Sequence, residues 1–126
     1  MNNIDLTQAV EALIKFRSER DWSKFHTPKN LSMSIAIEAS ELMEHFQWKN
    51  EDEVNQYLSI PENLEKVKEE IADILSYLLL LSTDLKIDLN RTLLDKIQKN
   101  AEKYPVSKCK GSLPNTTNYK RKEVFI

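Results

Sequence analysis

Two segments of this chain repeat one helical pattern, and this repeat constrains the fold more than any other feature of the sequence. When the first segment is shifted by 32 positions, its apolar residues fall on those of the second, and both follow the spacing i, i+4, i+7, i+11. The matched pairs are Ile35 and Val67, Ala39 and Ile71, Leu42 and Ile74, and Phe46 and Leu78. Each stripe marks one face of an α-helix, so the repeat predicts two long helices that pack together.

The same two segments carry acidic pairs in matching positions. Glu38 and Glu41 lie on the first segment, and Glu70 and Asp73 lie on the second. Because successive helical residues turn by about 100°, the acids lie roughly a quarter-turn from the stripes and meet at the edge of the seam when the stripes pack. Sheltered carboxylates repel one another unless a cation neutralises them. We therefore predict a bound metal ion, although acids also occupy many solvated helix faces.

The type of ligand narrows the choice of metal and substrate. Four oxygen donors without a cysteine or a well-placed histidine favour Mg²⁺ or Mn²⁺ over Zn²⁺. Magnesium takes its remaining ligands from water and substrate phosphates, which predicts a phosphorylated substrate. The single glycine, Gly111, lies outside the periodic segments. A Gly-rich phosphate loop and a dinucleotide fingerprint are therefore excluded, and side chains and metal must hold any phosphate.

Glycine and proline are scarce through residues 1–104, whereas Leu, Ile, Glu and Lys are frequent. This composition indicates an all-α chain with short connections, and 126 residues are enough for one domain. We expect the domain to occupy residues 1–112, followed by an irregular basic tail at 113–126. The expected helices cover about 5–20, 28–48, 51–58, 61–85 and 89–104.

Residues at two of the expected helix starts have the chemistry of caps. Thr27 can cap the helix that Pro28 begins, because proline fits the first helical position. Residues 59–62, Ser-Ile-Pro-Glu, match a capping box in front of the next long helix. Both signals therefore predict where a long helix begins.

The segment 71–81 is apolar on nearly every helical face. One small domain has too little other surface to cover it, which predicts burial in a homo-oligomer interface. Its longest apolar run, 74–81, is much shorter than the roughly 20 residues that span a bilayer. We see no signal peptide, and the lone Cys109 excludes an internal disulfide framework, so we expect a cytoplasmic protein without membrane association. The net charge of −2 disfavours a dedicated nucleic-acid binder.

Several other side chains have two interpretations. Trp22 and Trp48 flank the second expected helix and either clamp a planar base or fill core and interface area. Tyr77 lies one turn after Asp73 and has the same two interpretations. His45 follows Glu41 by four residues, which disfavours the Glu-x-x-His pairs of di-iron bundles and leaves it as a metal ligand or a partner of one.

The expected helix at 89–104 has one polar face. It carries Lys96, Lys99, Asn100 and Lys103 at the spacing i, i+3, i+4, i+7. Such a face is usually solvated. Opposite a metal site, it would supply cations for phosphate oxygens and an amide for a base edge.

Together these motifs resemble the all-α nucleoside triphosphate pyrophosphohydrolases, the MazG-like group, and in particular its dCTP pyrophosphatase branch. The family signature, Glu-x-x-Glu followed by Glu-x-x-Asp, stands here as Glu38/Glu41 and Glu70/Asp73. The resemblance spans about residues 6–112. Further matching segments are 19–22, 25–26, 28–31, 41–42, 46–49, 69–70, 77–78 and 88–89, with Lys96, Asn100, Tyr104 and Pro105.

The resemblance implies an all-α, MazG-like four-helix bundle assembled from oligomerising subunits, commonly a tetramer built as a dimer of dimers. It also implies that Mg²⁺ binds the four signature acids. One acid can also take the proton of the attacking water, and we expect Glu41 or Glu38 in this role, although the sequence does not separate a ligand from a general base. The residues implied to line the nucleotide site are Trp22, His26, Trp48, Tyr77, Lys96 and Asn100. Lys29 and Asn30 match the family's loop and either contact phosphate or shape the helix start.

The implied reaction is hydrolysis of a nucleoside triphosphate between the α and β phosphates, giving the monophosphate and pyrophosphate. Deoxycytidine triphosphate, including 5-modified forms, is the favoured substrate, and nucleotide pool sanitation is the implied role. Two alternatives stay open. One is a non-catalytic helical interaction module, and the other is a nucleotide-binding regulator that has lost turnover.

Overall fold

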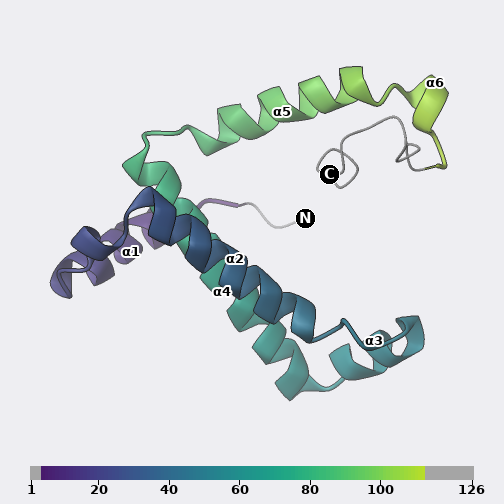
Figure 1. Cartoon of the computed structure of the whole chain (residues 1–126), viewed down its shortest axis with the longest axis horizontal. Coiled ribbons are helices and arrows are strands. Elements are labelled where there is room, and N and C mark those ends of the chain that lie inside the picture. Colours follow the sequence, from purple (N-terminus) through teal and green to yellow (C-terminus); the bar gives the residue numbers. More distant parts are fainter. Residues whose placement is uncertain (1–3, 113–126) are drawn as a thin grey trace. The chain divides into compact units, whose positions relative to one another are not determined.

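A computed structural model of the chain describes residues 4–112 (Figure 1). All regular elements in this part of the chain are helices, which confirms the all-α prediction. It divides into two compact units, one ending at Lys86 and the other beginning at Ile87. The first unit contains α1 (Thr7–Glu19), a 3₁₀ turn (Ser23–Phe25), α2 (Pro28–Glu44), α3 (Glu51–Leu58) and α4 (Pro61–Asp84). The second contains α5 (Leu89–Lys103) and α6 (Val106–Cys109).

The division into two units does not test the predicted domain boundaries. A single domain over residues 1–112 stays a prediction, and the tail at 113–126 lies outside the described residues. Two details differ from expectation. The helix expected to reach residue 48 ends at Glu44 and continues as turns, and α6 forms beyond the last expected helix, which ended at residue 104.

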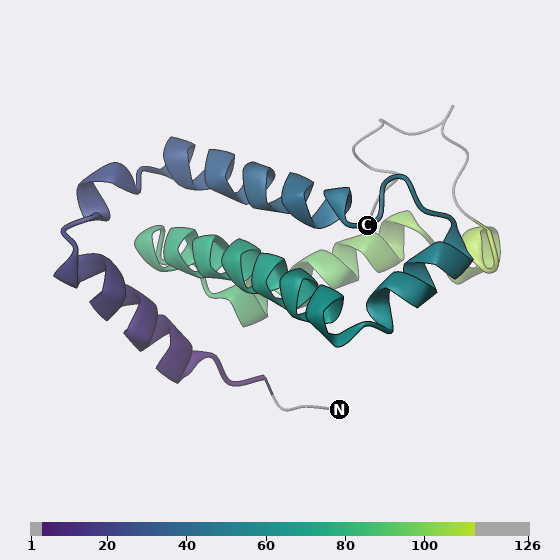
Figure 2. The same ribbon diagram turned by 90° about the horizontal axis from the view of Figure 1, so that it is seen from below.

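Helices α2 and α4 lie side by side and antiparallel in the first unit (Figures 1 and 2). At one end, the His26 ring just before α2 lies 6.4 Å from the Tyr77 ring. At the other end, His45 just after α2 lies 3.8 Å from Glu70. The most buried side chain, Leu31, is 1% exposed and comes from α2. The packed seam therefore runs from one end of α2 to the other and includes the part of α4 that carries Glu70 and Tyr77.

The packed face of α4 coincides only in part with the predicted apolar stripe, of which Val67 is buried and Ile74 is half-buried. Ile71 and Leu78, expected to face inward, are 50% and 40% exposed. Glu70 and Tyr77 are half-buried instead, beside buried Val67. Because α4 is apolar on most faces, its composition does not fix which face packs. Glu38 and Glu70 are consequently half-buried within the seam, whereas Asp73 is exposed.

The predicted start of α2 is confirmed. The Thr27 hydroxyl accepts a hydrogen bond from the Asn30 backbone N–H at 3.2 Å, and Pro28 occupies the first helical turn. This arrangement satisfies one of the free N–H groups at the helix start. It also fixes where α2 begins, directly after the loop that carries His26.

The predicted capping box before α4 is wrong. Ser59 ends α3 in the α-helical conformation, and its hydroxyl donates to the Gln56 carbonyl at 2.6 Å. Because an N-cap needs an extended backbone, Ile60 takes that position without a side-chain cap. A capping box forms instead at the start of α3, between Asn50 and Glu53.

Lys86 lies just beyond the end of α4 with a positive φ of 56°. A side chain with a Cβ is disfavoured in this left-handed region, whereas glycine adopts it freely. We expect Lys86→Gly to raise the free energy of unfolding by about 0.5–1 kcal/mol, measured by urea denaturation. Lys86→Ala is the control, because it removes the charge and keeps the strain. Equal stability changes in both variants would contradict this explanation.

Candidate active site

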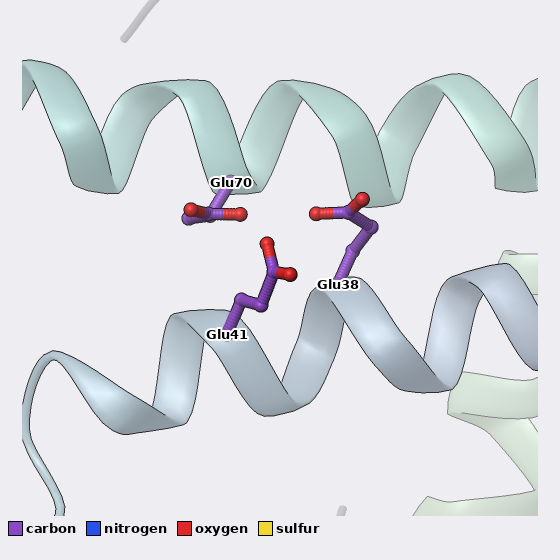
Figure 3. A group of neighbouring side chains, drawn as sticks. All are labelled: Glu38, Glu41 and Glu70. Carbon is purple, nitrogen blue, oxygen red and sulfur yellow. The ribbon is translucent and has the colours of Figure 1, made fainter.

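Three glutamates face one another across the seam between α2 and α4 (Figure 3). Glu38 and Glu41 are one helical turn apart on α2, and the antiparallel packing brings Glu70 of α4 opposite them. One carboxylate oxygen from each lies within 4.8 Å of the others. Donors at this spacing can contact one hard cation together.

The surroundings of Glu38 disfavour its charge. Burial raises the pKa of Glu38 to about 7, helped by the nearby Glu70 carboxylate and by the charges of Glu41 and Asp73. Its Oε2 atom is buried and has no hydrogen-bond partner within residues 4–112. An all-oxygen anionic group with an unpartnered buried atom fits Mg²⁺ or Mn²⁺.

A pocket of about 340 Å³ adjoins this acid cluster on the side of α1. Its lining consists of Leu13, Phe16, Arg17, Trp22, His26, Asp73, Ser76, Tyr77 and Leu80. Asp73, the fourth predicted metal ligand, lies outside the group of three glutamates but lines this pocket, and its charge acts on Glu38. The volume lies within the usual range for small-molecule sites.

Aromatic rings form a continuous series along the pocket. Phe16 contacts Trp22 with ring centroids 5.7 Å apart, Trp22 contacts His26 at 6.3 Å, and His26 contacts Tyr77 at 6.4 Å. All three contacts are edge-to-face. Trp22 keeps 42% of its surface exposed. Part of its ring is therefore available to a planar ligand.

The end of α1 holds Trp22 in place. The Trp22 N–H donates to the Arg17 carbonyl at 3.1 Å, and the Asp21 N–H donates to the Ser18 carbonyl at 3.0 Å. Asp21 has a φ of 53°. These features define a Schellman motif, in which the residue after the left-handed position packs back on the helix. Trp22 does so against Phe16, so the helix end itself positions one pocket wall.

The sequence did not reveal an ion pair beside this pocket. Arg17 is 9% exposed, and its two terminal nitrogens donate to the two Asp84 oxygens at 2.8 Å each. This bidentate contact joins α1 to the end of α4. A signal was present, because Arg17 continues the stripe of Leu6, Val10 and Leu13 and is a charged residue on an apolar face.

His26 contributes an unpaired polar atom to the pocket. Its Nδ1 is buried and has no hydrogen-bond partner in the described part of the chain. Burial lowers the pKa of His26, and the nearby Arg17 charge lowers it further. The imidazole is therefore neutral near pH 7, and it offers a ligand one donor and one acceptor.

The sequence matches the MazG-like family over residues 33–115. The chain belongs to this family. The chain is also similar to dCTP pyrophosphatase 1 of Rattus norvegicus, 36% identical over 107 residues, which are 85% of this chain and 63% of that protein. The Bos taurus protein of the same name is 39% identical over 98 residues, 78% of this chain and 58% of that protein. This chain thus spans less than two thirds of either relative.

A MazG-like fold is also supported by a solved structure. The crystal structure of a pyrophosphatase from Archaeoglobus fulgidus superposes with a TM-score of 0.74 and 40% sequence identity. The match covers 83% of this chain and 96% of the archaeal chain. The similarity therefore includes most of both proteins.

Three residues implied by the MazG-like resemblance do not join the pocket of the first unit. Trp48 lies in the turn after α2, is 86% exposed, and is absent from the pocket lining. Lys96 and Asn100 lie on α5 in the second unit. Nucleotide-binding roles for all three stay predictions, as do those for Trp22, His26 and Tyr77.

Proposed function

We propose that this protein is a Mg²⁺-dependent nucleoside triphosphate pyrophosphohydrolase, with Mn²⁺ as a substitute metal. One observation carries the proposal: an aromatic pocket large enough for a small ligand is lined by Asp73, whose charge acts on Glu38 of the nearby cluster of carboxylates. A nucleotide has a matching arrangement, because its planar base would fill the aromatic pocket while its polyphosphate reaches the metal at the carboxylates. The family membership and the names of the relatives support the same activity.

In this proposal, Glu38, Glu41, Glu70 and Asp73 hold the metal. When bound, the metal ion supplies Lewis-acid charge next to the phosphate oxygens. Glu38 or Glu41 takes a proton from the water that attacks the α phosphorus, and the bond to the β phosphate breaks to release pyrophosphate. Trp22, His26 and Tyr77 contact the base and orient the triphosphate for that attack.

We propose dCTP or a 5-modified dCTP as the substrate, and nucleotide pool sanitation as the role. Two relatives bear the name dCTP pyrophosphatase 1, which supports this choice. Aromatic rings stack with any base, so hydrogen bonds must discriminate. His26, with its unpartnered Nδ1, is a candidate, and Asn100 of α5 is another. The alternative is a helical nucleotide-binding or interaction module without turnover.

We also propose that the protein works in the cytoplasm as a homo-oligomer, as a tetramer built from two dimers. The support is apolar surface on α4, where Ile71, Leu75 and Leu78 are 37–50% exposed. An apolar groove of about 420 Å³ between α1 and α4 extends this surface. Monomeric proteins rarely leave such patches open. Within residues 4–112, no helix has both the length and the apolar character required to cross a membrane.

The test is pyrophosphate release from canonical and 5-modified deoxynucleoside and nucleoside triphosphates, with and without Mg²⁺. We expect release that requires Mg²⁺, is fastest with the deoxycytidine nucleotides, and falls by about 100-fold or more in Glu41→Gln. The accompanying product must be the monophosphate. If the folded protein binds nucleotides without releasing pyrophosphate, the alternative of a binding module replaces this proposal.

A further inference from the structure

His45 links the acid cluster to α3, and no step of the proposed reaction uses it. It follows the last residue of α2 and is the C-cap of that helix. Its Nδ1 lies 2.6 Å from the Tyr57 hydroxyl of α3, and its Nε2 lies 3.8 Å from Oε1 of Glu70 on α4. The side chains of His45 and Glu70 are only 16% and 19% exposed. One imidazole thus connects three helices at the edge of the cluster.

The contacts around His45 fix the direction of its ring. Its ring centroid lies 5.8 Å from that of Tyr57, and the Tyr57 ring in turn contacts Phe46 at 6.3 Å. Lys49 donates to the His45 carbonyl at 2.7 Å and lies 4.5 Å above the Tyr57 ring. A ring packed in this way has little freedom to rotate, so Nε2 stays directed toward Glu70.

The Glu70 carboxylate selects the tautomer of His45, because the Tyr57 hydroxyl can either donate to Nδ1 or accept from it. If Nδ1 accepts from the Tyr57 hydroxyl, the ring proton is on Nε2 and faces the Glu70 carboxylate, which is favourable. The opposite tautomer would present a lone pair to that carboxylate. At 3.8 Å the two atoms are too far apart for a direct hydrogen bond, and a shift of about 0.6 Å brings them within range.

We propose that His45, oriented by Tyr57, is a positioning residue for Glu70. Its N–H engages one Glu70 oxygen and leaves the other for the cation, as partners of carboxylate ligands do in metal sites. This inference rests on the proposed metal site and adds to it a Tyr57–His45–Glu70 series. The series determines how tightly the site binds its cation.

The experiment measures Mn²⁺ affinity without nucleotide, from the loss of the free-ion electron paramagnetic resonance signal. We expect His45→Leu to weaken binding by about 10-fold and Tyr57→Phe by about 3-fold, with no further loss in the double variant. His45→Gln places an amide N–H near the position of Nε2, so it should bind within about 3-fold of the unchanged protein. Adding Tyr57→Phe to His45→Gln should have no effect.

Phe46→Leu is the matched control, because it removes a ring from the same aromatic group without touching Glu70. We expect it to lower the melting temperature and leave Mn²⁺ affinity unchanged. The inference about His45 would be overturned, and the proposed metal site would not, if His45→Leu kept its Mn²⁺ affinity. The same would follow if all variants, including Phe46→Leu, lost affinity and stability in parallel. Absence of Mn²⁺ binding by the unchanged, folded protein would overturn the proposed metal site together with it.

Discussion

Glu38→Gln is expected to reduce pyrophosphate release by at least about 100-fold and, at pH 8, to stabilise the metal-free protein. The loss of activity follows from removal of one charged oxygen donor from the cluster. The gain in stability follows from removal of a charge that the fold disfavours, because Glu38 faces Glu41 and Glu70 within 4.8 Å. Activity and stability therefore move in opposite directions.

The size of the stability gain depends on pH. The pKa of Glu38 rises from its ordinary 4.5 to about 7 on folding, which corresponds to roughly 3 kcal/mol. Sharing of protons among the acids reduces this to about 2 kcal/mol. Between pH 4.5 and 7 the unfolded chain releases its proton while the folded chain keeps it, so stability falls as pH rises. We expect the variant to match the unchanged protein near pH 4.5 and exceed it above pH 7.

Urea denaturation of the metal-free proteins at several pH values measures this difference. Glu44→Gln, an exposed acid on the same helix, is the matched control and should change neither activity nor the pH profile. Excess Mg²⁺ should stabilise the unchanged protein more than Glu38→Gln, because the stability added by binding to the folded state grows with the logarithm of the affinity. A metal-free Glu38→Gln protein that is less stable at pH 8 would show that the cluster is not self-repelling.

The features of the fold that could be predicted are those with local causes. The start of α2 depends on Thr27 and Pro28, which act within one turn, and the acidic pairs depend on helical spacing. The packed face of α4 could not be predicted from the apolar pattern, because Ile71 and Leu78 are as apolar as the residues that do pack. Which face is buried depends on the partner helix and on further subunits.

In the candidate site, too, features with local causes could be predicted from the sequence and contacts between distant residues could not. The convergence of Glu38, Glu41 and Glu70 could be predicted because both helices carry the same register. The contact between Arg17 and Asp84 joins residues 67 positions apart, and the sequence indicates only that Arg17 continues an inward-facing stripe. Pairing across helices becomes visible only when the packing is known.

Asp84→Asn is expected to lower the free energy of unfolding by about 2–3 kcal/mol at pH 7. The substitution keeps the shape of the side chain but leaves the buried Arg17 guanidinium without a countercharge. Removal of one partner from a fully buried pair costs about 3–5 kcal/mol, and the Asp84 side chain remains 31% exposed, which reduces the expected loss. The Arg17 hydrogen bonds lower the pKa of Asp84. The contribution of Asp84 to the stability of the folded state is therefore complete above pH 3.8, the pKa of this group in the unfolded chain. It disappears as the pH falls through the lower pKa of the folded chain.

Two further variants separate the effect of the charge pair from that of packing. Asp21→Asn makes the same chemical change in the exposed pair with Lys24, whose side chains are 82% and 61% exposed, and should cost at most about 0.5 kcal/mol. Combining Arg17→Met with Asp84→Leu removes both charges and should recover at least half of the stability lost in Asp84→Asn. Denaturation at pH 7 and pH 3 measures all three, and the deficit of Asp84→Asn should shrink at the lower pH. A deficit that persists at pH 3, with no recovery in the double variant, would mean that side-chain shape rather than charge holds α1 to α4.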